Sequence, residues 1–330
     1  CHIAGLFATN AFSALAAFAA SSAASPKSIA SRSRAVRSAS AGGVGAGALP
    51  AVFALALGIG IALAAFAICG VAATIASATP STQIWIPSTD IQPYKTVHLN
   101  FDSYIRTEKE PSNNVGYFGI PDGASLAPLY DFGPTVGVLP FEKIQAEVGF
   151  DLIYGGANTP AGLDKYPIYG NFKIGMPEDN TWIPAVAVGM YGIGTKKGDV
   201  TNGVYTKTGT DANIYYGLVA KTLPVVGRFS VGYYGLNKKA SVAGVYDRNG
   251  AKGDDNGLLA SWDRTLSEIS DKLWVAIDYQ GGKNAYGATS FGASWAFAKN
   301  VSVILGYDIF NNKDRAGQNT ATVQVDINFP

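Results

Sequence analysis

The chain ends in a segment that alternates strictly between apolar and polar residues. From Thr322 to Phe329, the apolar positions are Val323, Val325, Ile327 and Phe329, and a polar residue precedes each of them. Successive side chains of a β-strand point to opposite faces, so this period of two predicts a strand with one apolar and one polar face. The same pattern recurs along most of the chain. Strands that are apolar outside and polar inside are what a closed barrel in a membrane requires.

The first 78 residues differ in composition from the rest of the chain. They contain four basic residues and no acidic residue. An uncharged apolar run extends from Leu49 to Cys69, and an Ala-x-Ala site follows at 76–78. These three features together predict a secretory signal peptide over residues 1–78, with cleavage before Thr79.

Other interpretations of this region are also open. The apolar run reaches the ~20 residues of a membrane-spanning helix, so a transmembrane anchor is possible, but no basic stop-transfer cluster follows it. A lipoprotein anchor at Cys69 fits less well, because Ile68 occupies a position where that motif has a small residue. The first methionine is Met176, so we expect the true start within or before this sequence, and residues 1–45 need not be translated.

Composition excludes several classes of function. Both cysteines, Cys1 and Cys69, precede the predicted cleavage site, so the exported chain would depend on neither disulfides nor thiolate metal sites. The formal net charge of +1 argues against nucleic acid as a partner. The length of the exported part suits one large β-domain.

After Thr79 the sequence has no convincing segment with helical periodicity. It contains about twelve short alternating segments, each near the ~9–11 residues that a tilted membrane strand needs. Gly, Asn, Asp and Pro separate them. We therefore expect strands near 95–105, 130–139, 142–155, 165–175, 182–194, 211–222, 226–236, 257–266, 271–281, 285–297, 300–311 and 319–329.

The connections between these segments alternate in length. Short connections lie at 139–141, 177–181, 223–225, 267–270 and 298–299. The other set is mostly longer and polar, at 106–129, 156–164, 195–210, 237–256 and 312–318, with 282–284 as the brief exception. Short turns on one side and long loops on the other are typical of bacterial outer-membrane barrels, whose short turns are periplasmic.

A water-soluble β-sandwich would show similar alternation, with its apolar face as the core. The positions of the aromatic residues favour the membrane instead. Six of them lie towards predicted strand ends, where membrane barrels carry their interfacial girdles: Tyr154, Tyr166, Trp182, Tyr279, Trp295 and Tyr307.

Residues 95–329 resemble the broad family of bacterial outer-membrane β-barrels, porin-like in build. The resemblance rests on the strand pattern, the alternating connections and the C-terminal strand. It implies a location in the bacterial outer membrane, contact with membrane lipid, and an insertion machinery that reads the C-terminal aromatic residue, here Phe329. Pro330 follows that residue, which departs from the family pattern.

The parity of each strand predicts which charged residues face the lumen. A charge that faces lipid at the bilayer midplane costs about 2–4 kcal/mol, so charges on strands are lumen candidates. They either brace a filled barrel or form a mixed-sign lining that passes small polar solutes. The predicted pore-lining residues are His98, Asp102, Glu147, Asp151, Lys173, Lys221, Arg228, Lys272, Asp278, Asp308 and Asp326.

Two candidate sites of other kinds are weaker. His98 shares its predicted face with Asn100 and Asp102, whereas Ser103 faces the other way, so the sequence favours a polar lumen residue over a hydrolase. The loop 247–256 is acidic, but its spacing misses the calcium-loop pattern. We therefore predict no catalytic, cofactor or metal site.

These observations favour an outer-membrane barrel over 95–330 that acts as a porin-like channel for passive diffusion of small hydrophilic solutes, and not as an enzyme. The alternative is a non-conducting barrel that serves as a scaffold or docking surface through loops 106–129, 195–210 and 237–256. The segment 79–94 contains Pro87 and Pro93, which argue against a central strand. It either enters the lumen as a partial plug or lies in the periplasm.

Overall fold

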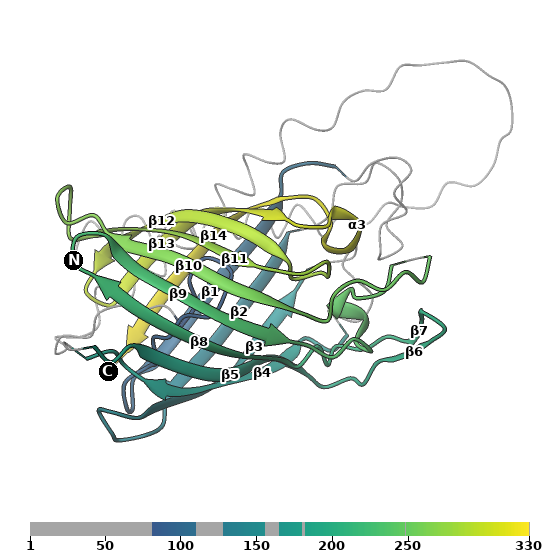
Figure 1. Ribbon diagram of the computed structural model, residues 1–330, viewed down its shortest axis with the longest axis horizontal. Helices are drawn as coiled ribbons and strands as arrows, with labels where there is room; N and C mark the ends of the chain where they lie inside the picture. The colour runs from purple at the N-terminus through teal and green to yellow at the C-terminus, as the bar shows by residue number, and fades with distance from the viewer. Residues whose placement is uncertain (1–80, 110–127, 156–164, 180–181, 248, 330) are drawn as a thin grey trace, which may run out of the picture. The chain divides into compact units, whose positions relative to one another are not determined.

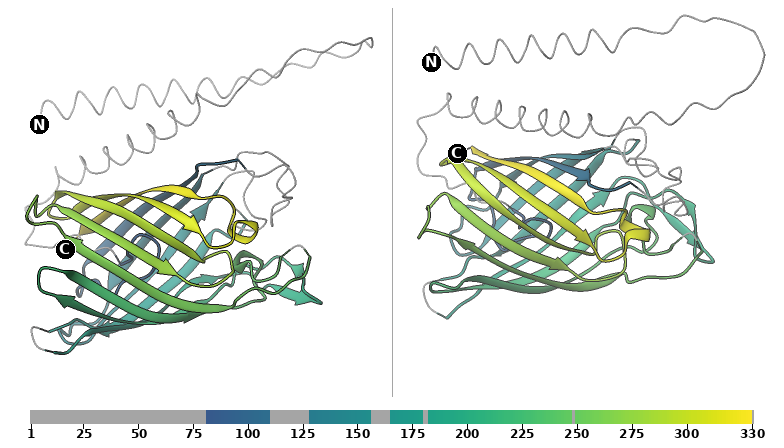
Figure 2. Two further views of the ribbon diagram at one scale, coloured as in Figure 1. Left: turned by 45° about the horizontal axis from the view of Figure 1, so that its top comes forward. Right: turned by 90° about the horizontal axis from the view of Figure 1, so that it is seen from above.

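The alternating segments form the strands of a closed antiparallel barrel (Figures 1 and 2). Within the described residues this barrel has twelve strands, so the predicted fold class is confirmed. The predicted signal peptide, residues 1–78, lies outside the described part of the chain. This computed structural model describes residues 81–109, 128–155, 165–179, 182–247 and 249–329.

The barrel strands have lengths typical of tilted membrane strands, and each overlaps one of the predicted segments. Their bounds are β1 Val97–Arg106, β2 Leu129–Gly137, β3 Gln145–Tyr154, β4 Ile168–Met176, β5 Ala185–Gly194, β8 Ile214–Leu223, β9 Gly227–Gly235, β10 Asn256–Thr265, β11 Leu273–Gln280, β12 Ala288–Ala298, β13 Val301–Phe310 and β14 Thr320–Phe329.

The ring closes where the first strand pairs with the last. Val97 of β1 lies opposite Phe329 of β14, and Arg106 lies opposite Thr320. Around the ring the order is β1-β14-β13-β12-β11-β10-β9-β8-β5-β4-β3-β2, so each strand pairs with its neighbours along the barrel sequence. Every backbone ladder is therefore completed within the ring, which is what a sheet in hydrocarbon requires.

Four short elements in the longer connections were not predicted. Strands β6 (Asp199–Thr201) and β7 (Val204–Lys207) form a separate hairpin between β5 and β8. A single turn of 3-10 helix, η1, spans Ser241–Ala243, and the one-turn helix α3 spans Lys313–Ala316. The β6–β7 hairpin and α3 lie at the same end of the barrel (Figure 1). None of the helices in the described ranges has the length and apolar character of a membrane-crossing helix.

The outer surface of the barrel is apolar. Along β3, Val148, Phe150 and Leu152 point outward and are exposed, while Glu147, which precedes Val148, is buried and points into the lumen. Water-soluble proteins rarely expose a continuous apolar surface of this extent, whereas a lipid-facing surface requires it. Further exposed apolar side chains on the strands are Phe132, Ile168, Phe172, Ile174, Val188, Val219, Phe229, Val231, Leu258, Ile277, Phe291, Leu305 and Ile309.

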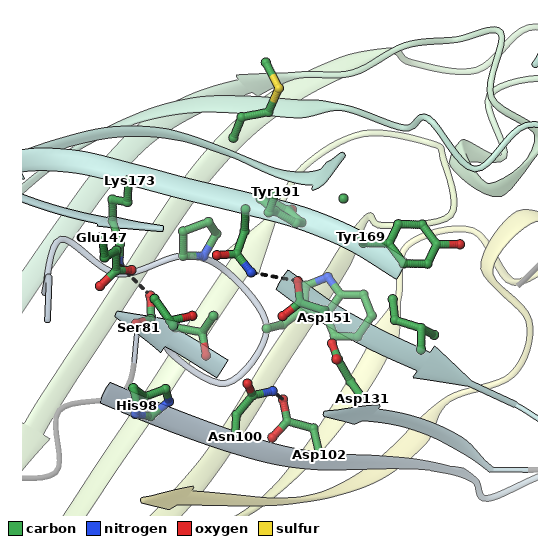
Figure 3. A pocket seen from close by; sticks show the side chains of 18 of the residues that line it. Ser81, His98, Asn100, Asp102, Asp131, Glu147, Asp151, Tyr169, Lys173 and Tyr191 are labelled. Atoms are coloured by element: carbon green, nitrogen blue, oxygen red, sulfur yellow. Dashed lines mark hydrogen bonds and ion pairs between the residues drawn. The ribbon is translucent and has the colours of Figure 1, made fainter. Parts of the chain in front are cut away.

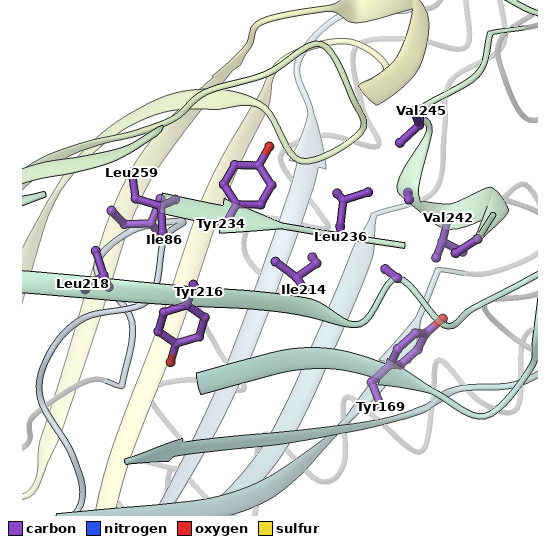
Figure 4. Packing of buried hydrophobic residues seen from close by; sticks show 13 residues of the cluster. Ile86, Tyr169, Ile214, Tyr216, Leu218, Tyr234, Leu236, Val242, Val245 and Leu259 are labelled. Carbon is purple, nitrogen blue, oxygen red and sulfur yellow. The ribbon is translucent and has the colours of Figure 1, made fainter. Parts of the chain in front are cut away.

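A hydrophobic cluster fills part of the lumen towards the end with the longer connections (Figure 4). Ile214, Tyr216 and Leu218 contribute from β8, and Val242 and Val245 contribute from the connection between β9 and β10. That connection folds back onto the barrel, which buries apolar surface inside the lumen.

The connection 236–255 is fastened by the buried Arg315 of α3. Its guanidinium donates hydrogen bonds to the carbonyl oxygens of Gly244 at 3.2 Å, Val245 at 2.6 Å and Ala251 at 2.9 Å. We expect Arg315→Met to free this connection without opening the barrel, because these hydrogen bonds do not involve the barrel strands. Limited proteolysis should then cut within 236–255 far faster than in the parent, while the folded barrel still migrates as a compact species on gels. Unchanged cleavage would contradict the fastening role.

Candidate functional site

The lumen contains a cavity of about 220 Å³ (Figure 3). Its wall comes from β1 to β5, β8 and β14, from the residues that precede β1, and from Tyr286 in the connection between β11 and β12. Polar and charged side chains reach it because the inward positions of β1, β3 and β4 carry them at every second residue. The lumen is thus polar around the cavity and apolar where the hydrophobic cluster lies.

Three carboxylates line one side of the cavity: Asp102, Asp131 and Asp151. Asp102 of β1 lies directly opposite Asp131 of β2 in the ladder. Asp151 accepts a hydrogen bond from Asn171 at 2.9 Å, and Asp102 accepts one from Asn100 at 3.3 Å. Among the described residues, none of the three carboxylates forms a salt bridge, and Asp131 Oδ1 is buried without a hydrogen-bond partner.

Aromatic side chains line much of the remaining wall. Trp85 packs edge-on against Tyr104 with ring centroids 5.4 Å apart, and Tyr191 lies 6.0 Å from Tyr216 and 6.5 Å from Tyr286. All five rings border the cavity. The cavity wall therefore combines aromatic rings with three carboxyl side chains.

His98 belongs to a different group of contacts. Its Nδ1 lies 2.6 Å from Asn328 Oδ1, and its Nε2 lies 3.4 Å from Asp326 Oδ1. Ser302 donates to the other carboxylate oxygen of Asp326 at 3.3 Å. The carboxylate, and not the imidazole, is therefore next to the hydroxyl, so His98 is not placed to accept the Ser302 proton in the way that nucleophilic catalysis requires.

The lumen cations are held in close contacts. Lys173 Nζ lies 3.1 Å from Glu147 Oε1, and both side chains are buried. Arg228 forms a bidentate pair with Asp90, at 2.7 and 2.8 Å, and a further bond to Asp263 at 3.0 Å. Both positive charges are thereby paired with carboxylates other than Asp102, Asp131 and Asp151.

The structure brings most of the predicted pore-lining residues into the lumen but does not bring all of them to the cavity. Arg228, Asp278 and Asp308 point into the lumen but do not border the cavity. Asp308 accepts a hydrogen bond from Thr320 at 2.6 Å. Those at the cavity are His98, Asp102, Glu147, Asp151, Lys173 and Asp326.

Two predicted residues lie elsewhere. Lys221 has the outward parity of its neighbour Val219 on β8, and its ammonium group reaches Glu178 at 3.8 Å in the connection between β4 and β5. Lys272 precedes β11 and is exposed at the barrel end. Both placements correct the inward assignment, because a charge at the end of a strand can reach water without entering the lumen.

Sequence reasoning missed Asp131, Asp263 and Asp90. The first two lie between outward-facing neighbours, so stricter use of the alternation would have found them: Asp131 precedes the exposed Phe132, and Asp263 follows Trp262. Asp90 lies before the first strand, where no period reports which way a side chain points.

No protein-family model and no curated protein matches this sequence. Similar solved structures include an outer-membrane channel from Pseudomonas putida F1, at 9% identity and a TM-score of 0.42, covering 73% of this chain and 97% of that one. The KdgM porin has 7% identity and a TM-score of 0.38, covering 71% and 98% of the two chains. The NanC porin has 11% identity and a TM-score of 0.38, covering 70% and 99%.

The barrel itself defines the class of protein. It has an even number of antiparallel strands, a closed ring, an apolar outer surface and a polar lumen. These are the properties of membrane-spanning barrels of the bacterial outer-membrane type. The predicted porin-like class is therefore confirmed at the level of fold.

Proposed function

We propose that the protein is a porin-like channel for passive diffusion of small hydrophilic solutes, with a preference for cations. The observation that supports the preference is the group of three cavity carboxylates, Asp102, Asp131 and Asp151, which form no salt bridge among the described residues. A wall of one charge sign in a low-dielectric setting raises the local concentration of the opposite ion.

This proposal differs from a mixed-sign lining with weak selectivity. The cations that would balance the carboxylates are engaged elsewhere, Lys173 with Glu147 and Arg228 with Asp90 and Asp263. The aromatic rings Tyr104, Tyr191 and Tyr216 are compatible with organic cations as well as metal ions, because ring faces attract positive charge.

The test is the reversal potential of the refolded chain in planar bilayers under a potassium chloride gradient. We expect cation preference in the parent, and a shift towards anions in the triple variant Asp102→Asn, Asp131→Asn, Asp151→Asn, which keeps the side-chain size. The control is Asp199→Asn in the exposed β6–β7 hairpin, which should leave the reversal potential unchanged.

Two results would count against the proposal. An unchanged reversal potential in the triple variant would remove the assigned role of the carboxylates. Absence of conductance in the parent and in every variant described below would favour the alternative, a non-conducting barrel that acts as a scaffold through its longer connections.

A further inference from the structure

The residues before β1 form a segment inside the ring of strands, Ser81–Tyr94, which we call the lumen segment (blue in Figure 2). Near its start, the backbone N–H groups of Ile84 and Trp85 donate to Asp278 Oδ2 of β11, at 2.8 and 2.9 Å. Near its end, the N–H of Gln92 donates to Glu147 Oε2 of β3 at 2.7 Å. The order of strands places β3 and β11 six positions apart in either direction around the ring. The lumen segment therefore crosses from one wall to the opposite one.

Side chains of the wall supply most of the polar contacts. Lys173 Nζ donates to the carbonyl oxygens of Ser81 at 2.9 Å and Asp90 at 2.5 Å. Gln324 donates to the carbonyl oxygen of Ile84 at 2.7 Å. Arg228 holds the carboxylate of Asp90 in a bidentate pair. Buried charges are stable only when they are paired and hydrogen-bonded, and here the lumen segment supplies many of their partners.

The wall also has a steric seat for the lumen segment. Gly292 of β12 and Gly306 of β13 lie opposite each other in the ladder. A Cβ atom at these positions would come within 3.0 Å of Ile84 Cδ1 and 2.9 Å of Ile84 Cγ2, respectively. Ile84 is 1% exposed. The missing side chains of this glycine pair make the room that Ile84 occupies.

The lumen segment is nevertheless not part of the barrel sheet. Its ladder contact with the strands is one isolated bridge, Tyr94 to Gly137. Elsewhere in the lumen, the inward hydroxyls of Ser230 and Ser261 are buried without a hydrogen-bond partner among the described residues. A buried polar group without a partner costs about 1–3 kcal/mol, which water would recover in an open lumen. The ring of strands is thus closed without any residue of the lumen segment.

We infer that the lumen segment is an intramolecular plug, which restricts the channel when it is seated across the lumen and opens it when it is released. This inference rests on the proposed channel function. The lumen segment is held mainly by the charged side chains of Arg228, Lys173 and Asp278. A change of charge at one of these contacts therefore releases it. Ile86 adds an apolar contact to the hydrophobic cluster.

The first test is a charge reversal and its rescue, recorded as single-channel conductance of the full chain. Asp90→Arg places a second cation against Arg228, and we expect a several-fold rise in conductance. The double variant Asp90→Arg with Arg228→Asp restores opposite charges between positions 90 and 228, although it places a carboxylate beside Asp263, and should lower the conductance back towards the parent value. Asp199→Arg, which reverses an exposed pair with Lys239, is the matched control and should have no effect.

A steric variant tests the same inference without a change of charge. Gly306→Leu fills the seat of Ile84 and should also raise the conductance. Heat-modifiable migration on gels shows for each variant that the barrel has folded. If Asp90→Arg and Gly306→Leu both fold and both conduct as the parent does, the plug inference is overturned while the channel function stands.

A third readout does not depend on conduction. Thr89 is 3% exposed, and its hydroxyl has no hydrogen-bond partner among the described residues, so Thr89→Cys removes no side-chain hydrogen bond among them. With Cys1 and Cys69 replaced by serine, it becomes the single thiol. A membrane-impermeant maleimide should label it slowly in the parent, rapidly with Asp90→Arg and slowly again in the charge swap. Rapid labelling of the otherwise unchanged chain would overturn the seated plug even if no variant conducts.

Discussion

Replacing Lys173 with methionine should destabilise the folded barrel by about 3–5 kcal/mol, because it leaves a buried carboxylate without its cation. Lys173 is 3% exposed, and its ammonium group lies 3.1 Å from Glu147. Methionine fills much of the same volume, so the loss reports the ammonium group, with its ion pair and its hydrogen bonds to the carbonyl oxygens of Ser81 and Asp90, and not packing. The measurement is the free energy of unfolding from urea titration in lipid vesicles.

The double variant Lys173→Met with Glu147→Gln should recover much of this loss, because it removes the uncompensated charge together with its partner. Lys221→Met is the matched control. Its pair with Glu178 is longer, at 3.8 Å, and both side chains are partly exposed, so we expect a change of about 0–1 kcal/mol. Equal losses from the two lysine variants would contradict the buried pair.

Replacing Val148 with arginine should cost about 2–4 kcal/mol, because the new charge faces lipid within the span of β3. Val148 is 44% exposed and pairs with Val136 and Phe172, both outside the lumen. The free energy of unfolding is again measured by urea titration in lipid vesicles. A compact species on gels at urea concentrations below the unfolding transition shows that the variant inserts.

Leu223→Arg provides the comparison at a strand end. Leu223 is 47% exposed, so the two sites have similar exposure and differ mainly in their position along the strand. A charge near the interface costs about 0–1 kcal/mol. If both variants lose the same free energy, or if neither loses any, the apolar outer surface is not immersed in lipid.

The strands could be predicted from the sequence because a membrane barrel enforces alternation on most of them. In β3 the apolar set Val148, Phe150 and Leu152 faces lipid, and Glu147 and Asp151 face the lumen, so period and chemistry agree. The physical cause is the cost of exposing polar groups to hydrocarbon, which acts on each residue independently of distant contacts.

Strand β8 shows where that rule fails. Its inward residues Ile214, Tyr216 and Leu218 are apolar because the hydrophobic cluster occupies the lumen there, and its outward residue Val219 is apolar because of lipid. Because both faces of β8 are apolar, only the charge of Lys221 indicated which face is inward. That charge gave the wrong face, since Lys221 has the outward parity of Val219. The contacts of Asp90 were likewise beyond prediction, since they depend on which part of the ring a segment without periodicity reaches.

The pairing of β1 with β14 has a further consequence for association between molecules. A ring in which every strand has two partners presents no free backbone donors and acceptors at an edge, so another chain cannot be added to it as an extra strand. Among the described residues, the open edges belong to β6 and β7, which are three and four residues long. Any assembly of several barrels would therefore depend on side-chain packing within the lipid-facing surface or on the connections.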